Sequence, residues 1–139
     1  MKFKSMFLAF LSVFYCSCVL AGDKLLLQQA VQNQGLFFFY SASCPHCQRF
    51  APVLKQFSVR YGFKVLAISV DGGYLPSFPD AVMDEGQKNI FRVTTLPSLF
   101  LVEPAHQQVA LITDGALDET ELSRRIFKVL KLQKGEQKA

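Results

Sequence analysis

The stretch LFFFYSASCPHCQRF, residues 36–50, decides the fold. It opens with a continuous apolar run over 36–40, which is typical of a strand buried on both faces of a sheet. A short loop follows over 41–43. From Cys44 onward, apolar side chains recur at spacings of four, three and four, which predicts one face of a helix: Phe50, Leu54, Phe57 and Tyr61. The stretch therefore predicts a central strand, a loop, and a helix that begins with two cysteines.

Cys44-Pro45-His46-Cys47 is the motif that carries chemistry. A helix N-terminus favours a thiolate through its free N–H groups and its dipole, so Cys44 is predicted to have a lowered pKa and to be the attacking thiol. Pro45 suits the first helical turn, where its missing N–H leaves nothing unpaired. His46 adds a positive or hydrogen-bonding group that stabilises the thiolate and makes the disulfide more oxidising. Cys47, one turn in, is predicted to be the resolving thiol with the higher pKa.

Two other interpretations of this cysteine pair are weaker. As a structural staple, the loop it closes is so short that it stabilises the fold by roughly 2 kcal/mol, against about 3 kcal/mol for a 15-residue loop. As a structural zinc site, it lacks a second pair of ligands, since His106 is the only other histidine. The sequence therefore predicts no metal and no cofactor beyond a redox-active disulfide between Cys44 and Cys47.

The rest of the chain alternates between helix-like and strand-like patterns. An amphipathic segment over 24–34 comes before the first strand, and a second strand is expected over 64–70. The residues that follow are predicted as an irregular surface loop over 71–80, a short helix near 82–91, and an antiparallel hairpin formed by the runs 93–102 and 109–113. Asp118 and Glu121 form a capping box that opens a last helix. A disordered tail is expected over 133–139.

The first 21 residues read as a cleaved signal peptide. Lys2 and Lys4 precede an apolar run of about 14 residues, and the run ends in small residues before Gly22. Crossing a bilayer as a helix takes roughly 20 apolar residues, which favours cleavage over a retained anchor. Lipidation at Cys16 or Cys18 is a third option, but the context of a lipoprotein signal is missing. The predicted mature part is a single domain over 22–139.

Charge and cysteine content narrow the function classes. The predicted mature chain carries thirteen basic and eleven acidic side chains, a balance that does not indicate nucleic-acid binding. Its only cysteines are Cys44 and Cys47. An exported protein would be expected to use cysteines as long-range cross-links. This pair instead predicts a disulfide that opens and closes.

On these residues the chain resembles the thioredoxin superfamily over roughly 25–132. The matching features are the strand 36–40, the Cys-Pro-His-Cys motif, the mid-helix Pro52, and Leu96-Pro97 before a buried strand. The resemblance implies a single α/β domain with a central mixed sheet flanked by helices. It also implies that Pro52 bends the active-site helix, that Pro97 is a cis-proline, and that Leu96 and Pro97 belong to the substrate-binding surface.

A closer resemblance is to the TraF/TrbB group of F-type conjugative transfer systems. It rests on VDGGYLPSFP, residues 70–79, and LVEP, residues 101–104. The chain has no room for the helical insertion of DsbA or the dimerisation domain of DsbC. The resemblance implies a periplasmic disulfide oxidase or isomerase, and a monomer is the default expectation. Its partners would be cysteine-containing exported proteins, such as pilus or secretion-channel components, and a membrane or soluble redox partner that resets the site.

One position departs from the family pattern. Phe38 stands six residues before Cys44, where many thioredoxins bury an acidic residue that helps to deprotonate the second cysteine. The proton acceptor for Cys47 is therefore left open by the sequence. Two other functions also remain open, namely a thioredoxin-fold scaffold subunit of the transfer apparatus and a periplasmic disulfide reductase.

Overall fold

The computed structural model of the chain describes residues 22–138. The signal peptide predicted over 1–21, with Cys16 and Cys18, lies outside these residues. Within 22–138, no helix combines the length and the apolar character needed to cross a membrane.

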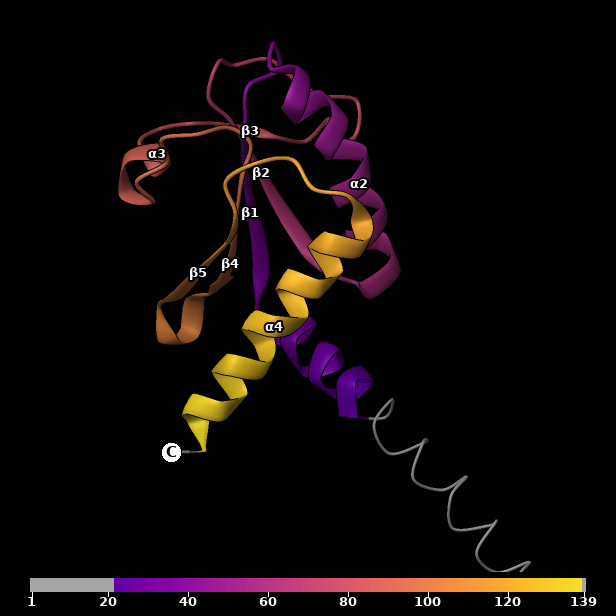
Figure 1. Cartoon of the computed structure of the whole chain (residues 1–139). Helices are drawn as coiled ribbons and strands as arrows, with labels where there is room; N and C mark the ends of the chain where they lie inside the picture. The colour runs from indigo at the N-terminus through magenta and orange to yellow at the C-terminus, as the bar shows by residue number, and fades with distance from the viewer. Residues whose placement is uncertain (1–21, 139) are drawn as a thin grey trace, which may run out of the picture.

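The described residues form one mixed sheet of five strands in the order β3-β2-β1-β4-β5 (Figure 1). β1 pairs in parallel with β2, and β2 with β3, whereas β4 is antiparallel to β1 and β5 antiparallel to β4. The strands are β1 Gly35–Tyr40, β2 Lys64–Ser69, β3 Val82–Met83, β4 Ser98–Glu103 and β5 Gln108–Thr113. The predicted mixed sheet is therefore confirmed.

β1 lies in the middle of the sheet and is apolar on both faces, as its sequence predicts. Leu36, Phe38 and Tyr40 point to one face, where they pack with residues of the two long helices. Phe37 and Phe39 point to the other face, where a smaller cluster includes Phe91. A continuous apolar run is needed because neither face of this strand meets water.

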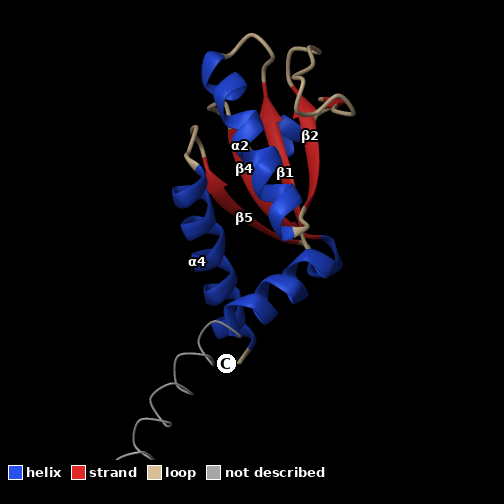
Figure 2. Cartoon of the chain, turned by 90° about the vertical axis from the view of Figure 1, so that its right-hand side faces the viewer, coloured by secondary structure: helices blue, strands red, loops and turns tan. Residues whose placement is uncertain are grey.

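Two long helices, α2 Pro45–Tyr61 and α4 Glu119–Gln137, cover one face of the sheet (Figure 2). Residues 22–33 form a further helix. The predicted apolar stripe of α2 is confirmed, since Phe50, Leu54 and Phe57 are buried. The stripe of α4 packs into the same core through Leu122, Ile126 and Leu130. This shared core holds α2 against β1 and so fixes the position of the first turn of α2.

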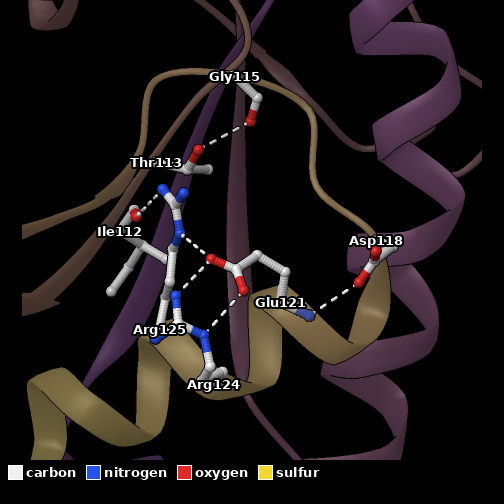
Figure 3. A network of polar contacts seen from close by, with 7 residues as sticks. All are labelled: Ile112, Thr113, Gly115, Asp118, Glu121, Arg124 and Arg125. Atoms are coloured by element: carbon white, nitrogen blue, oxygen red, sulfur yellow. Dashed lines mark hydrogen bonds and ion pairs between the residues drawn. The ribbon is translucent and has the colours of Figure 1, made fainter.

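Half of the predicted capping box at the start of α4 is present. The Asp118 carboxylate accepts the N–H of Glu121 at 2.8 Å, which is the expected N-cap. The Glu121 carboxylate does not return to the Asp118 backbone but accepts hydrogen bonds from Arg124 and Arg125 (Figure 3). These hydrogen bonds lower the pKa of Glu121 to about 2. Arg125 also reaches the carbonyl of Ile112 on β5.

Two sequence predictions for the segment between β2 and β4 need correction. The helix expected near 82–91 is only α3 Gln87–Ile90, because Val82–Met83 instead pairs with β2 and Gly86 adopts a φ of 115°. The loop 71–80 is irregular as predicted but not wholly on the surface, since Leu75 and Phe78 are buried in the core.

The hairpin is confirmed, with a first strand shorter than the predicted run 93–102 and a second strand that begins one residue before the predicted run 109–113. It begins at Ser98, directly after Pro97, and turns through the short 3₁₀ helix η1 Pro104–His106. The disorder predicted over 133–139 is wrong as far as Gln137, because α4 continues to that residue. Leu130 anchors the last turns that reach the core, and Lys131 pairs with Asp23.

Candidate redox site

Cys44 lies at the N-cap of α2, where the loop that follows β1 turns into the helix. Its backbone is extended, with φ −83° and ψ 118°, and Pro45 occupies the first helical turn. The Cys44 Sγ accepts the backbone N–H of Cys47 at 3.4 Å. A sulfur in the usual place of a capping oxygen is favoured as an anion, because the free N–H groups of the first turn point at it.

The surroundings of Cys44 lower the pKa of its thiol. Partial burial acts in the opposite direction, but it is outweighed by hydrogen bonds from the side chain and backbone of Cys47, by the backbone of His46 and by the charge of Arg49. The predicted direction of the Cys44 pKa is therefore confirmed. Cys44 is only half-buried, so its sulfur is accessible to the sulfur of another protein, both as a nucleophile and as the target of a thiolate.

The imidazole of His46 does not act in the way that its sequence position suggests. Arg49 Nη2 lies 2.7 Å from His46 Nδ1. A guanidinium can only donate, so Nδ1 accepts here and carries no proton. The contribution of His46 to Cys44 comes from its backbone, and the positive charge comes from Arg49. Arg49 was not among the predicted site residues, although its place one turn into the helix, three residues after His46, was a signal for this role.

Cys47 is fully buried. Desolvation raises the pKa of its thiol to about 12, with further contributions from the hydrogen bond to Cys44 and from the charges of Cys44 and Asp71. The two thiols thus differ in the predicted direction, with Cys44 the better nucleophile and Cys47 the poorer acid. Phe38, where an acidic residue was expected by family resemblance, is fully buried against the rings of Tyr40, Phe50 and Phe78. It offers no proton acceptor.

Leu96 and Pro97 lie directly before β4, the strand that pairs with β1, and Leu96 lies next to Cys44. The Leu96–Pro97 peptide bond is cis. The carbonyl oxygen of Leu96 lies 4.0 Å from Cys44 Sγ. The structure therefore brings together all six site residues that the sequence predicted: Cys44, Pro45, His46, Cys47, Leu96 and Pro97.

A third segment reaches the site from the end of β2. Its residues were predicted to form a surface loop and carried part of the TraF/TrbB resemblance, but no contact with the cysteines was predicted for them. The carboxylate of Asp71 accepts hydrogen bonds from the loop 41–43. Gly73 lies so close to that loop that a Cβ added to it would be 2.5 Å from the Cβ of Ala42. The signal in the sequence was Asp-Gly-Gly directly after a buried strand. Its partner loop is about 30 residues away in the chain, so local pattern could not identify the contact.

No metal-binding cluster accompanies these residues. Across residues 22–138, nowhere do three or more His, Cys, Asp or Glu side chains come together as a possible metal site. The chemistry that the described arrangement supports is that of the two sulfurs, one half-buried with a lowered pKa, the other buried with a raised pKa.

A comparison with family models gives a match over residues 22–127, to the family described as TraF, F plasmid transfer operon protein. The chain belongs to the TraF family. Its relatives include Protein TraF of Escherichia coli K12, 31% identical over 79% of this chain and 46% of that protein. Protein TrbB of the same organism is 34% identical over 73% of this chain and 58% of that protein. This member of the TraF family thus spans about half the length of these curated relatives.

Solved structures confirm the thioredoxin fold of this TraF family member. A putative thiol:disulfide interchange protein DsbE from Chlorobium tepidum has a TM-score of 0.59 at 20% identity, over 75% of this chain and 84% of that one. The MTB DsbF structure has a TM-score of 0.51 at 23% identity, over 74% and 84% of the two chains. The fold and the family predicted by resemblance are both confirmed.

Proposed function

We propose that this chain is a thiol–disulfide oxidoreductase that transfers a disulfide between Cys44–Cys47 and the cysteines of partner proteins. The observation that carries the proposal is the position of Cys44 Sγ, which caps α2 and accepts the Cys47 N–H at 3.4 Å. This arrangement supports one nucleophilic sulfur and one protonated sulfur at neutral pH, which is the division of work that disulfide exchange needs.

In the oxidising direction, a thiolate of the partner protein attacks Cys44 Sγ of the oxidised site. A mixed disulfide forms as the Cys44–Cys47 bond breaks, and Cys47 leaves with the electron pair and takes a proton. A second thiolate of the partner then attacks its own sulfur in the mixed disulfide, and Cys44 leaves as a thiolate. The partner loses two electrons and gains a disulfide, while the Cys44–Cys47 pair is reduced.

The lowered pKa of Cys44 favours this direction, because a stabilised thiolate is a good leaving group and stabilises the reduced form. The raised pKa of Cys47 acts after the first step, because the released sulfur is kept protonated and attacks the mixed disulfide again less readily, which leaves time for the second thiolate of the partner. The reduced pair then needs a disulfide-bearing redox partner, in the membrane or in solution, to accept its two electrons.

The cellular setting that we propose is the periplasm, with export through residues 1–21 and action on exported components of a conjugative pilus or secretion channel. Membership of the TraF family, described as an F plasmid transfer operon protein, supports this setting. The basic start, apolar run and small residues before Gly22 support export. We also propose that the chain works as a monomer.

The reduction potential of the Cys44–Cys47 couple tests the direction of transfer. The protein beginning at Gly22 is equilibrated with glutathione buffers, and the fraction oxidised is read by alkylation of free thiols. We expect a potential near about −120 mV, that of a disulfide donor, or about −180 mV, that of an isomerase. A value near about −270 mV would instead make the chain a reductase and overturn the oxidising direction.

A second experiment separates catalysis from a scaffold role. Cys44→Ala removes the reactive sulfur and leaves Leu96 and Pro97 in place. We expect a cell with this variant to lose assembly of the transfer apparatus as fully as a cell without the protein. Normal assembly with Cys44→Ala would sink the catalytic proposal and favour the scaffold. Ser77→Ala, on the loop after β2, is the matched control.

A further inference from the structure

The loop over 41–43, just before Cys44, is held from two sides. From the helix side, Gln48 Nε2 donates to the carbonyl oxygen of Ala42 at 2.8 Å. From the other side, the loop meets the residues that follow β2. Because Cys44 continues directly from this loop, the position of its sulfur over the first turn of α2 depends on how the loop is fixed.

Asp71 provides most of the second attachment. Its Oδ2 accepts hydrogen bonds from the Ser41 hydroxyl at 2.7 Å and from the Ser43 N–H at 3.3 Å. Its Oδ1 accepts the Ala42 N–H at 3.1 Å. One carboxylate thus contacts each of the three loop residues, two of them through the backbone.

The same carboxylate is itself fixed from its own segment. It accepts the Gly73 N–H at 3.1 Å and the Ser69 hydroxyl at 3.2 Å. The Gly73 carbonyl in turn accepts hydrogen bonds from Ser69 and Tyr40, which connects the segment back to the end of β1. The hydrogen bonds to Ser41, Ala42, Gly73 and Ser43 together hold the pKa of Asp71 well below its usual range. Asp71 therefore stays ionised, and it is not a base for Cys47.

We propose that Asp71 is a positioning residue of the redox site, whose carboxylate holds the loop 41–43 against the segment after β2 and so places Cys44 over the start of α2. The proposal rests on the proposed function only for its biological meaning, since the placement of the two sulfurs can be measured without a partner protein. None of the six residues predicted from sequence supplies this contact.

Asp71 acts on the two thiols in different ways. Its charge contributes to the raised pKa of Cys47. It is not among the groups that act most strongly on Cys44. After burial, these are the side chain of Cys47, then the backbone N–H groups of Cys47 and His46 in the first turn, and the charge of Arg49. Removing the carboxylate should therefore lower the pKa of Cys47 by loss of a negative charge, and raise the pKa of Cys44 by loosening its alignment with those N–H groups.

The test is the pH dependence of alkylation by iodoacetamide in the reduced protein. Cys44 is followed in a Cys47→Ser background and Cys47 in a Cys44→Ser background, each with and without Asp71→Asn. We expect Asp71→Asn to move the two pKa values in opposite directions, and alkylation of Cys44 at neutral pH to slow by about threefold to tenfold. Ser77→Ala, on the same segment but without a hydrogen bond to the loop, should leave both pH profiles unchanged.

Two results would overturn the proposal. If Asp71→Asn lowers both pKa values by the same amount, Asp71 acts as a charge alone and does not position Cys44. If neither profile moves, it has no role in the site. Where Asp71→Asn does not fold, Ser41→Ala decides, because it removes the shortest hydrogen bond and keeps the charge. We expect Ser41→Ala to raise the pKa of Cys44 alone, and an unchanged Cys44 profile would also overturn the proposal.

Discussion

Arg49 illustrates how a single residue sets the nucleophile. Its guanidinium donates to His46 and its charge acts on Cys44. We expect Arg49→Gln to raise the pKa of Cys44, because it removes the positive charge near the sulfur and leaves the helix N-terminus intact. The measurement is the pH profile of Cys44 alkylation.

The control for Arg49→Gln is Arg60→Gln at the other end of α2. Arg60 pairs with Glu119 and lies about four helical turns away from the cysteines. Its replacement should leave the Cys44 profile where it is. If both variants shift the profile equally, the effect comes from the net charge of the chain and not from the position of Arg49.

Phe38 stands six residues before Cys44, at the position where many thioredoxins bury an acidic residue. It is fully buried among the rings of Tyr40, Phe50 and Phe78. We expect Phe38→Ala to lower the free energy of unfolding by about 3 to 5 kcal/mol, because the neighbouring rings cannot close the cavity. Urea unfolding of the oxidised protein measures it. A loss below about 1 kcal/mol would mean that the aromatic cluster collapses around the gap.

At the scale of elements, the site depends on a close approach between two loops. A Cβ on Gly73 would lie 2.5 Å from the Cβ of Ala42. We expect Gly73→Ala to separate the loops and to slow alkylation of Cys44, while Ala42→Gly in the same chain should restore much of the rate because it removes the clashing atom. Absence of any rescue would show that the effect of Gly73→Ala comes from its own backbone and not from the contact.

The control for this pair is Gly115→Ala, in the turn after β5. A Cβ there would meet nothing within 4 Å. Cys44 should be alkylated in Gly115→Ala at the same rate as in the unaltered chain. A slower rate in Gly115→Ala would mean that the assay responds to loss of stability anywhere in the fold.

The elements that sequence predicted well are those whose signal is local. The central strand and α2 were identified because apolar periodicity and the cysteine motif lie within residues 36–50. β3 was missed because two exposed residues, Val82 and Met83, become a strand only by pairing with β2. The tail over 133–139 was expected to be disordered because chain termini are usually poorly ordered, yet α4 continues to Gln137.

The site followed the same division. Cys44, Cys47, Leu96 and Pro97 were predicted from short motifs and from family resemblance, and the structure places them together. Asp71 could not be predicted, because its partners over 41–43 are far away in the chain and a turn is the ordinary reading of Asp-Gly-Gly.

For the whole molecule, the sheet order explains why the loop 41–43, Asp71 and the Leu96–Pro97 segment meet at the same end of the sheet. β1 and β2 are parallel neighbours, so the loop 41–43 and Asp71 both lie beyond their carboxyl ends. β4 is antiparallel to β1, so its start, after Pro97, lies at the same edge. The arrangement gathers the nucleophile, the loop that positions it and the Leu96 carbonyl, while the core on both faces of β1 holds them in place.

The two thiols should also shape how the stability of the reduced protein depends on pH. Cys44 has a folded pKa below its unfolded value of about 8.5. The contribution of Cys44 to the free energy of unfolding is fully present above about pH 8.5 and is lost as pH falls through the folded pKa. Cys47 has a folded pKa raised to about 12. Its contribution is fully present below about pH 8.5 and is lost as pH rises toward the folded value.

Stability relative to a Cys44→Ser/Cys47→Ser variant, which keeps every other titrating group, should therefore rise with pH up to about 8.5. Above that it should fall by up to about 1.4 kcal/mol per pH unit, because the unfolded Cys47 ionises and the buried one does not. Urea unfolding under reducing conditions measures both limbs. Cys47→Ser alone should keep the rise and lose the alkaline fall. A fall that persists in Cys47→Ser would mean that the buried thiol is not its source.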